Sequence, residues 1–383
     1  MEKVVMKSFL MSILRAAIFL GFIFLITGCS GGNLVAGGPT PTPSPGNAFV
    51  YTANASGNNV SAFANGGTGA LTEVPGSPFS VPGQPSGIAA TPDNKFLYVT
   101  QFQNDQISSF LISPASGVLT ALACPTVPTT DVQPLKIAIN PAGTLLYTAN
   151  QVGSVSGFTI SATTGCLTLI STTPTDTVAR GITIDQSGQF LYVVTGGGGI
   201  DTFQIGATGT LTRLATAGFD SGTSTMLAVK AVPTFELLMA TDGGGTNNLR
   251  TFNINTGSGV LTPIVTTPGG SSPANPSAIA FNTALNATTP LFYIANTASN
   301  NLTVNTVDAT GAIGATNLTV PDPTGPIDLA VDPIGKFLYV ANSGSNTVSV
   351  FNANITAANT NTALISTSPT GGEPESIVVV GHP

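Results

Sequence analysis

Histidine is almost absent from this chain, and so are the residue groupings that most catalytic and metal sites require. The 383 residues contain one His, at position 382, and three Cys. No Cys and His residues have the spacing of a metal site, and a single His beside the C-terminus cannot serve a catalytic triad in its usual place. No Ser lies in a nucleophile elbow. The sequence therefore predicts no metal and no cofactor.

Charged residues are also scarce, and basic residues are the scarcest. Charged residues make up 7% of the chain, with 10 Lys and Arg against 17 Asp and Glu, so the formal net charge is −7. No basic cluster is present, which argues against a nucleic acid partner and against attraction to an anionic membrane surface. Tryptophan is missing, but a hydrophobic content of 42% excludes intrinsic disorder. The 44 Gly and 28 Pro are typical of a chain that turns every few residues.

Residues 1–28 have the pattern of a signal peptide. Lys3, Lys7 and Arg15 form a basic beginning, and an apolar run of residues 16–27 follows. The run is too short to span a bilayer and has the length of a signal-peptide core. It ends in Leu-Ile-Thr-Gly-Cys, which resembles the cleavage box of bacterial lipoproteins. That resemblance implies a lipoprotein signal peptide.

Cys29 is the lipid carrier that this resemblance implies, because the Cys of such a box becomes the new N-terminus. The alternative is an ordinary signal peptide, with Cys29 incidental. Residues 29–47 are rich in Pro and Gly, and alternating prolines hold such a tether extended. We expect a lipid-anchored protein outside the cytoplasm, in the cell envelope, at the outer membrane or cell surface if the cell has two membranes.

A tyrosine recurs in six of seven repeats that cover residues 48–383. Each repeat has a segment such as Phe-Leu-Tyr-Val-Ala-Asn, and the repeats are 45 to 54 residues apart. The residues at this position are Tyr51, Tyr98, Tyr147, Tyr192, Met239 (the degenerate copy), Tyr293 and Tyr339. Units of this length with four short strands are propeller blades. The sequence predicts an all-β, seven-bladed β-propeller with four-stranded antiparallel blades, whose tyrosines pack between blades.

The ring is predicted to close through the C-terminus. The first repeat begins at its second strand, residues 48–54, with no inner strand before it. Residues 374–380 match the inner-strand pattern but have no blade of their own. The C-terminal strand therefore supplies the innermost strand of blade one, which removes an exposed sheet edge.

Cys124 and Cys166 are predicted to lie at the outer strands of blades two and three. In an exported protein this pair could form a disulfide. The alternative is two separate half-buried thiols, because outer strands of neighbouring blades diverge. The sequence leaves both open.

The Tyr-Val-Thr/Ala-Asn strand, the Pro-Asp-Asn-Lys turn and the Gly-x-Leu-Thr outer strand resemble the YVTN-repeat propellers and the seven-bladed lactonase family, which includes 6-phosphogluconolactonase. The enzymes of that family carry an inner-strand Pro-Arg-His, and a Glu after the Tyr-bearing strand of the same blade. Arg180 aligns with the family Arg, whereas Gly181 and Gly196 stand at the His and Glu positions. The resemblance thus implies the fold, and leaves Arg180 as the one catalytic candidate.

A ligand-binding mouth is predicted where the inner strands begin and the Tyr-bearing strands end. Its charged candidates are Lys136, Arg180, Asp328 and Glu375, and its polar ring comprises Asn54, Asn150, Asp242, Asn296 and Asn342. The alternative for the charged residues is salt-bridged or solvated filling of the channel. The alternative for the Asn residues is a turn role, since Asn tolerates left-handed conformations.

Three functions remain open at this point. The first is a membrane-anchored, non-catalytic binding or interaction module, monomeric, with an unidentified protein or a small polar ligand as partner. The second is a lactonase-like hydrolase with a diverged site around Arg180. The third is a structural protein of the cell envelope. The absence of a general base beside Arg180 favours the first, because ester hydrolysis needs a group that deprotonates water.

Overall fold

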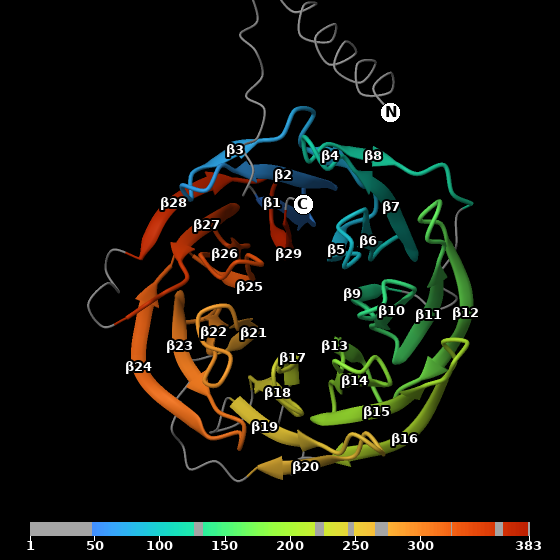
Figure 1. Cartoon of the computed structure of the whole chain (residues 1–383). Coiled ribbons are helices and arrows are strands. Elements are labelled where there is room, and N and C mark those ends of the chain that lie inside the picture. The colour runs from blue at the N-terminus through green and yellow to red at the C-terminus, as the bar shows by residue number, and fades with distance from the viewer. Residues whose placement is uncertain are drawn as a thin grey trace, which may run out of the picture. The chain divides into compact units, whose positions relative to one another are not determined.

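The described part of the chain is a ring of seven antiparallel sheets (Figure 1). The computed structural model describes residues 48–125, 133–218, 226–243, 249–264, 275–322, 324–356 and 363–381. Within these ranges there is no helix, and hence none that could cross a membrane. The predicted signal peptide, Cys29, the tether and His382 lie outside the described residues.

Each blade contributes one inner strand to the centre of the ring and places a second strand beside it. The inner strands of blades one to seven are β29 (Pro374–Gly381), β5 (Pro85–Ala90), β9 (Pro134–Ile139), β13 (Ala179–Ile184), β17 (Met226–Ala231), β21 (Pro276–Asn282) and β25 (Pro326–Val331). The second strands are β1 (Ala48–Asn54), β6 (Phe96–Gln101), β10 (Leu145–Asn150), β14 (Phe190–Thr195), β18 (Leu237–Asp242), β22 (Leu291–Asn296) and β26 (Phe337–Asn342). These second strands carry the Tyr repeat and are almost entirely buried.

Two further strands complete each blade toward the outside. The third strands are β2 (Asn59–Asn65), β7 (Gln106–Ile112), β11 (Ser154–Ile160), β15 (Gly199–Ile205), β19 (Leu249–Ile254), β23 (Asn301–Val307) and β27 (Thr347–Asn352). The outer strands are β3 (Leu71–Glu73), β8 (Leu119–Ala121), β12 (Leu167–Pro174), β16 (Leu211–Gly218), β20 (Leu261–Ile264), β24 (Ile313–Pro321) and β28 (Leu364–Pro369). In blade one, β4 (Phe79–Ser80) also pairs with β2. The predicted seven blades of four strands are confirmed.

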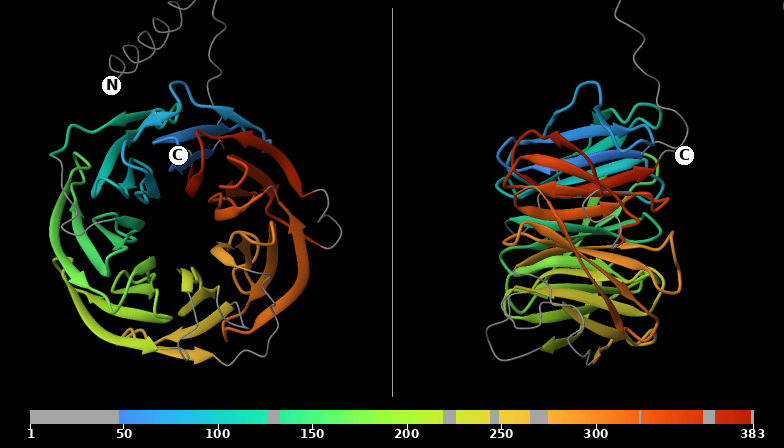
Figure 2. Two further views of the ribbon diagram at one scale, coloured as in Figure 1. Left: turned by 180° about the vertical axis from the view of Figure 1, so that it is seen from behind. Right: turned by 90° about the vertical axis from the view of Figure 1, so that its left-hand side faces the viewer.

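The two ends of the propeller meet in one sheet. Strand β29 pairs antiparallel with β1, with Phe49 opposite Val380 and Thr52 opposite Ile377. Figure 2 shows this junction from behind, where the blue and red strands lie side by side. The predicted closure by the C-terminal strand is confirmed, and it joins the ends of the ring by backbone hydrogen bonds.

The repeated tyrosines hold neighbouring blades together. All six are completely buried, and in blades one to four each hydroxyl donates to a glycine carbonyl in the outer turn of the next blade. These pairs are Tyr51 with Gly117 at 2.8 Å, Tyr98 with Gly165 at 2.7 Å, Tyr147 with Gly209 at 2.8 Å and Tyr192 with Gly259 at 3.1 Å. Buried tyrosines usually find such a partner, so the predicted packing role is confirmed.

The glycines that accept these hydrogen bonds have a steric reason to be glycine. Gly117 has a φ of +70°, and a Cβ there would clash with the ring of Phe49 in the preceding blade. Gly259 has the same φ and the same relation to Phe190. Contact between blades therefore explains the glycine of the Gly-x-Leu-Thr motif. Only glycine combines this backbone conformation with so close an approach to the aromatic ring of the preceding blade.

Candidate functional site

The mouth of the channel is built from a bulge that recurs near the start of every inner strand. In β13, for example, Ala179 lies opposite Thr195 and Gly181 opposite Val194, so Arg180 is the extra residue. The equivalent extra residues in the other blades are Ser86, Leu135, Leu227, Ser277, Ile327 and Glu375; in β5 and β17 two unpaired residues face one unpaired residue of the second strand. A bulge re-aims the side chain it carries. The ring of bulges therefore presents one residue from each blade at the rim.

Hydrogen bonds between blades fix the backbone just before these bulges. A residue with positive φ precedes the inner strand in at least five blades: Gln84, Gln133, Asn275, Gly325 and Glu373. Several of their N–H groups donate to a side-chain oxygen in the hairpin of the preceding blade. The donor and acceptor residues are Gln84 with Asn58 at 2.8 Å, Gln133 with Asp105 at 2.6 Å, Gly325 with Asn300 at 2.8 Å, and Glu373 with Asn346. These hydrogen bonds hold the rim at blades one, two, three and seven.

A central cavity of about 480 Å³ lies inside the seven inner strands. Its walls are mostly small and aliphatic side chains, and the charged residues that line it are Lys136, Lys230 and Asp328. Arg180 and Glu375 are not part of these walls and belong to the rim. The sequence prediction missed Lys230. An alignment of the inner strands contains a signal for it, because the other six blades have a small side chain at the equivalent position.

Three of the predicted mouth residues are joined by contacts across blades. The Lys136 ammonium donates to the backbone carbonyl of Glu375 at 2.9 Å, which spans from blade three to blade one. Asp328 accepts hydrogen bonds from the Ser376 hydroxyl at 2.7 Å and from the Ile377 N–H at 3.1 Å. These contacts make Lys136 and Asp328 part of the closure of the ring.

Glu375 lies within this network of charges. Burial raises the pKa of the Glu375 carboxyl, Lys136 opposes the rise, and Glu373 and Asp328 add to it. The structure therefore brings Lys136, Asp328 and Glu375 together beside the closing strand β29.

Arg180 has a different environment. Its side chain is exposed, and no hydrogen bond or ion pair joins it to any residue that the structure describes. A Cβ placed on Gly196 would lie 3.5 Å from Arg180 Nε, so the residue at 196 is the natural neighbour of the guanidinium. Because that residue is glycine, the guanidinium keeps its donors available to a ligand.

Gly181 is fixed by the approach of the neighbouring blade. A Cβ at this position would lie 2.9 Å from a methyl carbon of Val194, 3.0 Å from the Leu227 carbonyl oxygen and 3.3 Å from Ala228 Cα. A side chain at position 181 would therefore require Val194 and the backbone of β17 to move by a few tenths of an ångström. With glycine there, the chain has no imidazole beside Arg180.

The predicted polar ring at the mouth needs correction. Asn54, Asn150, Asp242, Asn296 and Asn342 are the last residues of their strands, and each is 0% exposed. Their side chains point into the blade. The Asn54 amide, for instance, donates to Asn59 Oδ1 at 2.7 Å and to Ser61 Oγ at 2.9 Å. They bind the second strand to the third instead of facing a ligand.

Asp242 performs the same task with a charge. It forms an ion pair with Arg250 at 3.1 Å, and Arg250 lies opposite Ala240 as Ser61 lies opposite Thr52. Blade five thus replaces an Asn–Ser hydrogen bond by an Asp–Arg pair. This exchange explains why the fifth copy of the repeat ends in Asp.

The two remaining cysteines are joined. Cys124, after β8, and Cys166, before β12, form a disulfide between blades two and three. The bridge that the sequence left open is therefore present in the structure. Among the described residues, no group of three or more His, Cys, Asp or Glu side chains could hold a metal.

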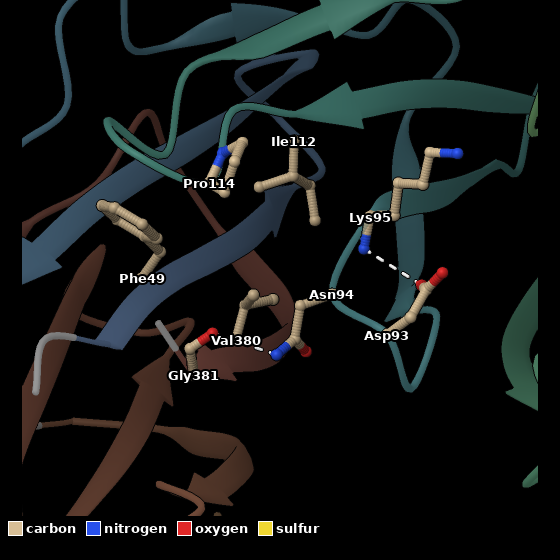
Figure 3. Close-up of a pocket in the computed structure, with 8 residues that line it drawn as sticks. All are labelled: Phe49, Asp93, Asn94, Lys95, Ile112, Pro114, Val380 and Gly381. Atoms are coloured by element: carbon tan, nitrogen blue, oxygen red, sulfur yellow. Dashed lines mark hydrogen bonds between the residues drawn. The ribbon is translucent and has the colours of Figure 1, made fainter. Parts of the chain in front are cut away.

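A second cavity of about 210 Å³ opens between blades one and two at the opposite end of the inner strands (Figure 3). Asn94, in the turn between β5 and β6, donates to the Gly381 carbonyl at 3.0 Å across it. Phe49, Ile112 and Val380 form the apolar side of this cavity. The contact fastens the end of the closing strand β29 to blade two.

The sequence profile of the seven-bladed β-propeller lactonases matches residues 42–175 and 228–379. The chain belongs to this family. The matched ranges include four of the seven inner strands completely and most of β17 and β29, and they omit residues 176–227, which contain Arg180, Gly181 and Gly196. Family membership therefore rests on the scaffold and not on this candidate site. A search of curated protein sequences gave no match.

Solved structures with the same architecture include several that are described as lactonases. A putative 6-phosphogluconolactonase from Bacteroides uniformis has a TM-score of 0.72 at 17% identity, and the match covers 88% of this chain and 100% of the other. A periplasmic gluconolactonase from Pseudomonas aeruginosa has a TM-score of 0.73 at 16% identity, with 88% and 100% coverage. At this level of identity the likeness establishes a common fold.

Proposed function

We propose that this protein is a non-catalytic binding module whose channel mouth holds a small polar anion. The observation that carries the proposal is Arg180, an exposed guanidinium at the rim of the channel that no described residue neutralises. Guanidinium groups form strong, charge-assisted hydrogen bonds with carboxylates and phosphates. The protein's overall charge is negative. A cation without a described partner at the mouth therefore favours the binding of anions at this place on the surface.

The groups that hydrolysis would need are placed elsewhere. Asp185 is buried at the far end of β13, where its carboxylate accepts from the N–H groups of Gln189 at 3.0 Å and Phe190 at 2.9 Å. Glu375 belongs to blade one, nearly opposite blade four in the ring (Figure 1). Neither can place a base next to Arg180. A lactonase with a diverged site is the second candidate, and family membership supports it.

Hydrolysis of 6-phosphogluconolactone separates the two functions. We expect the purified protein to hydrolyse it no faster than buffer does, since a positioned base alone contributes roughly 10²–10⁴-fold. Release of acid can be followed with a pH indicator, corrected for spontaneous hydrolysis. Clear turnover that disappears in Arg180→Ala would establish the lactonase instead.

Binding tests the module directly. We expect Arg180→Ala to weaken binding of a simple sugar acid such as gluconate about tenfold, the loss of one charge-assisted contact of about 1.4 kcal/mol. Titration calorimetry gives the affinities, and a thermal melt checks that the variant is folded. Lys95→Gln is a matched control, because Lys95 follows the turn at the opposite end of the inner strands and its ammonium donates to the Ala162 carbonyl. Equal affinity in wild type and Arg180→Ala would remove Arg180 from the site.

We further infer that Cys29 carries a lipid that holds the propeller at a membrane outside the cytoplasm. The support is the sequence of residues 1–29, in which a short apolar run ends in a lipoprotein-like cleavage box. Replacing Cys29 by Ser is expected to release the protein from the membrane fraction and to stop incorporation of labelled fatty acid. Unchanged retention in the membrane fraction, with cleavage at another residue, would identify an ordinary signal peptide or a different anchor.

A further inference from the structure

Lys230 interrupts a ring of small side chains in the channel. The residue opposite the repeated Tyr or Met in each inner strand is Val378, Ala89, Ala138, Thr183, Lys230, Ala280 and Ala330, in blade order. All seven line the central cavity. Six of them leave space, and the seventh places an exposed ammonium in that space. A lysine on such a wall needs an anion or water as its partner.

Lys230 and Arg180 also stand apart from the other described cations. Arg213 pairs with Asp176 and Asp201, and Arg250 pairs with Asp242. The ammonium groups of Lys95, Lys136 and Lys336 donate to backbone carbonyls. No described residue forms a hydrogen bond or ion pair with Arg180 or Lys230. The two cations without a described partner thus lie on neighbouring strands of one channel, β13 and β17.

The two positions differ in depth along the channel. Gly181 of β13 packs against Leu227 and Ala228 of β17, so Arg180 is nearly level with Leu227. Lys230 lies three residues farther along β17, which is about 10 Å at the rise of a strand. Long, flexible side chains reduce this distance. One cation therefore marks the rim and the other the interior of the same cavity.

The anionic side of the channel is already occupied. Asp328 is bound to the Ser376 hydroxyl and the Ile377 N–H of β29, and Glu375 interacts with Lys136. The surplus positive charge is therefore concentrated at blades four and five. Resting on the proposed function, the geometry points to a second anion position at Lys230, and we propose that the channel takes an elongated dianion. One carboxylate pairs with Arg180 at the rim and the other with Lys230 inside.

Three six-carbon probes that differ in steps of one charge test this proposal. Glucarate carries a carboxylate at each end, gluconate carries one, and sorbitol carries none. We expect the wild-type protein to bind glucarate about tenfold more tightly than gluconate, the equivalent of one further ion pair of about 1.4 kcal/mol. The preference should diminish at high salt because exposed charge pairs are screened. Equal affinities for glucarate and gluconate would overturn the second position.

Variants separate this proposal from the proposed function. Lys230→Gln should abolish the preference for glucarate and leave gluconate binding unchanged, whereas Arg180→Ala should weaken both. Lys95→Gln makes the same change in net charge outside the walls of the central cavity and should change neither. A glucarate preference that survives in Lys230→Gln would show that Lys230 does not bind the second carboxylate, and it would leave the proposed function uncontradicted. If wild type binds none of the probes, the inner position and the proposed anion module both fail for this class. Thermal melts of each variant confirm folding.

Discussion

Asp322→Asn is expected to stabilise the protein at pH 8 and to leave its stability almost unchanged at pH 4. Asp322 follows β24 in the connection to blade seven, and both of its carboxylate oxygens are buried. Burial raises the pKa of this carboxyl from 3.8 to about 7, and hydrogen bonding to the Ser349 and Asn342 side chains opposes the rise only in part. A buried charge that its neighbours compensate only in part is costly.

The sign of the pH dependence follows from this raised pKa. Between pH 4 and 7 the folded state binds the proton more tightly than the unfolded state, so stability falls as the pH rises through this range. Below pH 4 the carboxyl is protonated in both states and has no effect. Above pH 7 the whole penalty is present, up to about 4 kcal/mol for three pKa units. Asp322→Asn removes the ionisable group and with it this penalty.

Denaturant unfolding at pH 4 and pH 8 measures the effect, and Asp308→Asn is an opposite control. Asp308 is partly exposed in a surface turn, and hydrogen bonds from Thr310 lower the pKa of its carboxyl. A lowered pKa contributes stability that is present at neutral pH and is lost as the pH falls through the folded-state value. At pH 8 the Asp308 variant should therefore be less stable than wild type. A stabilisation by Asp322→Asn of the same size at both pH values would show that Asp322 is not ionised when buried.

Removing the Cys124–Cys166 disulfide is expected to lower the free energy of unfolding by about 4 kcal/mol, from the loop entropy of a bridge of this span. The two residues are 42 positions apart in sequence and connect blades two and three. For a domain of this size the loss corresponds to a fall in Tm of roughly 6 °C. Thermal melts of wild type with and without reductant measure it.

The double variant Cys124→Ser/Cys166→Ser serves as the control for chemical reduction. It should melt at the temperature of the reduced wild-type protein and should not respond to reductant. A wild-type melt that reductant does not change, together with two free thiols in the native protein, would show that the bridge does not form. A large fall in Tm with an unchanged propeller signal in circular dichroism would show that the disulfide stabilises the protein by restricting the unfolded chain.

Repetition is the reason that the fold could be predicted from one sequence. Each copy of the Tyr-bearing strand reports the same environment, so seven weak patterns add up to one strong one. Tyr51, Tyr98, Tyr147 and Tyr192 indeed perform the same task in successive blades. The closing strand was also predictable, because an inner-strand pattern at residues 374–380 had no partner within its own repeat.

Side-chain direction at the ends of the strands could not be predicted in this way. Asn54 and its equivalents end a strand at the correct face, but whether the amide faces a ligand or the blade depends on the residue opposite on the next strand. Ser61 supplies a hydroxyl at 2.9 Å in blade one, and Arg250 supplies a cation in blade five. A buried amide with such a partner has its hydrogen bonds made within the protein. These residues therefore stabilise the blade and do not face a ligand.

The sequence by itself therefore determined the all-β architecture, the number of blades, the manner of closure and the family, because those depend on periodic local patterns. Tertiary structure alone decided the rest. Arg180 and Lys230 are 50 residues apart in sequence, and they share a channel only because two inner strands lie side by side. Asp322 is an ordinary loop aspartate until blades six and seven pack around its carboxylate. Burial and the nearest partner set the charge and availability of each of these groups, and both are properties of the assembled ring.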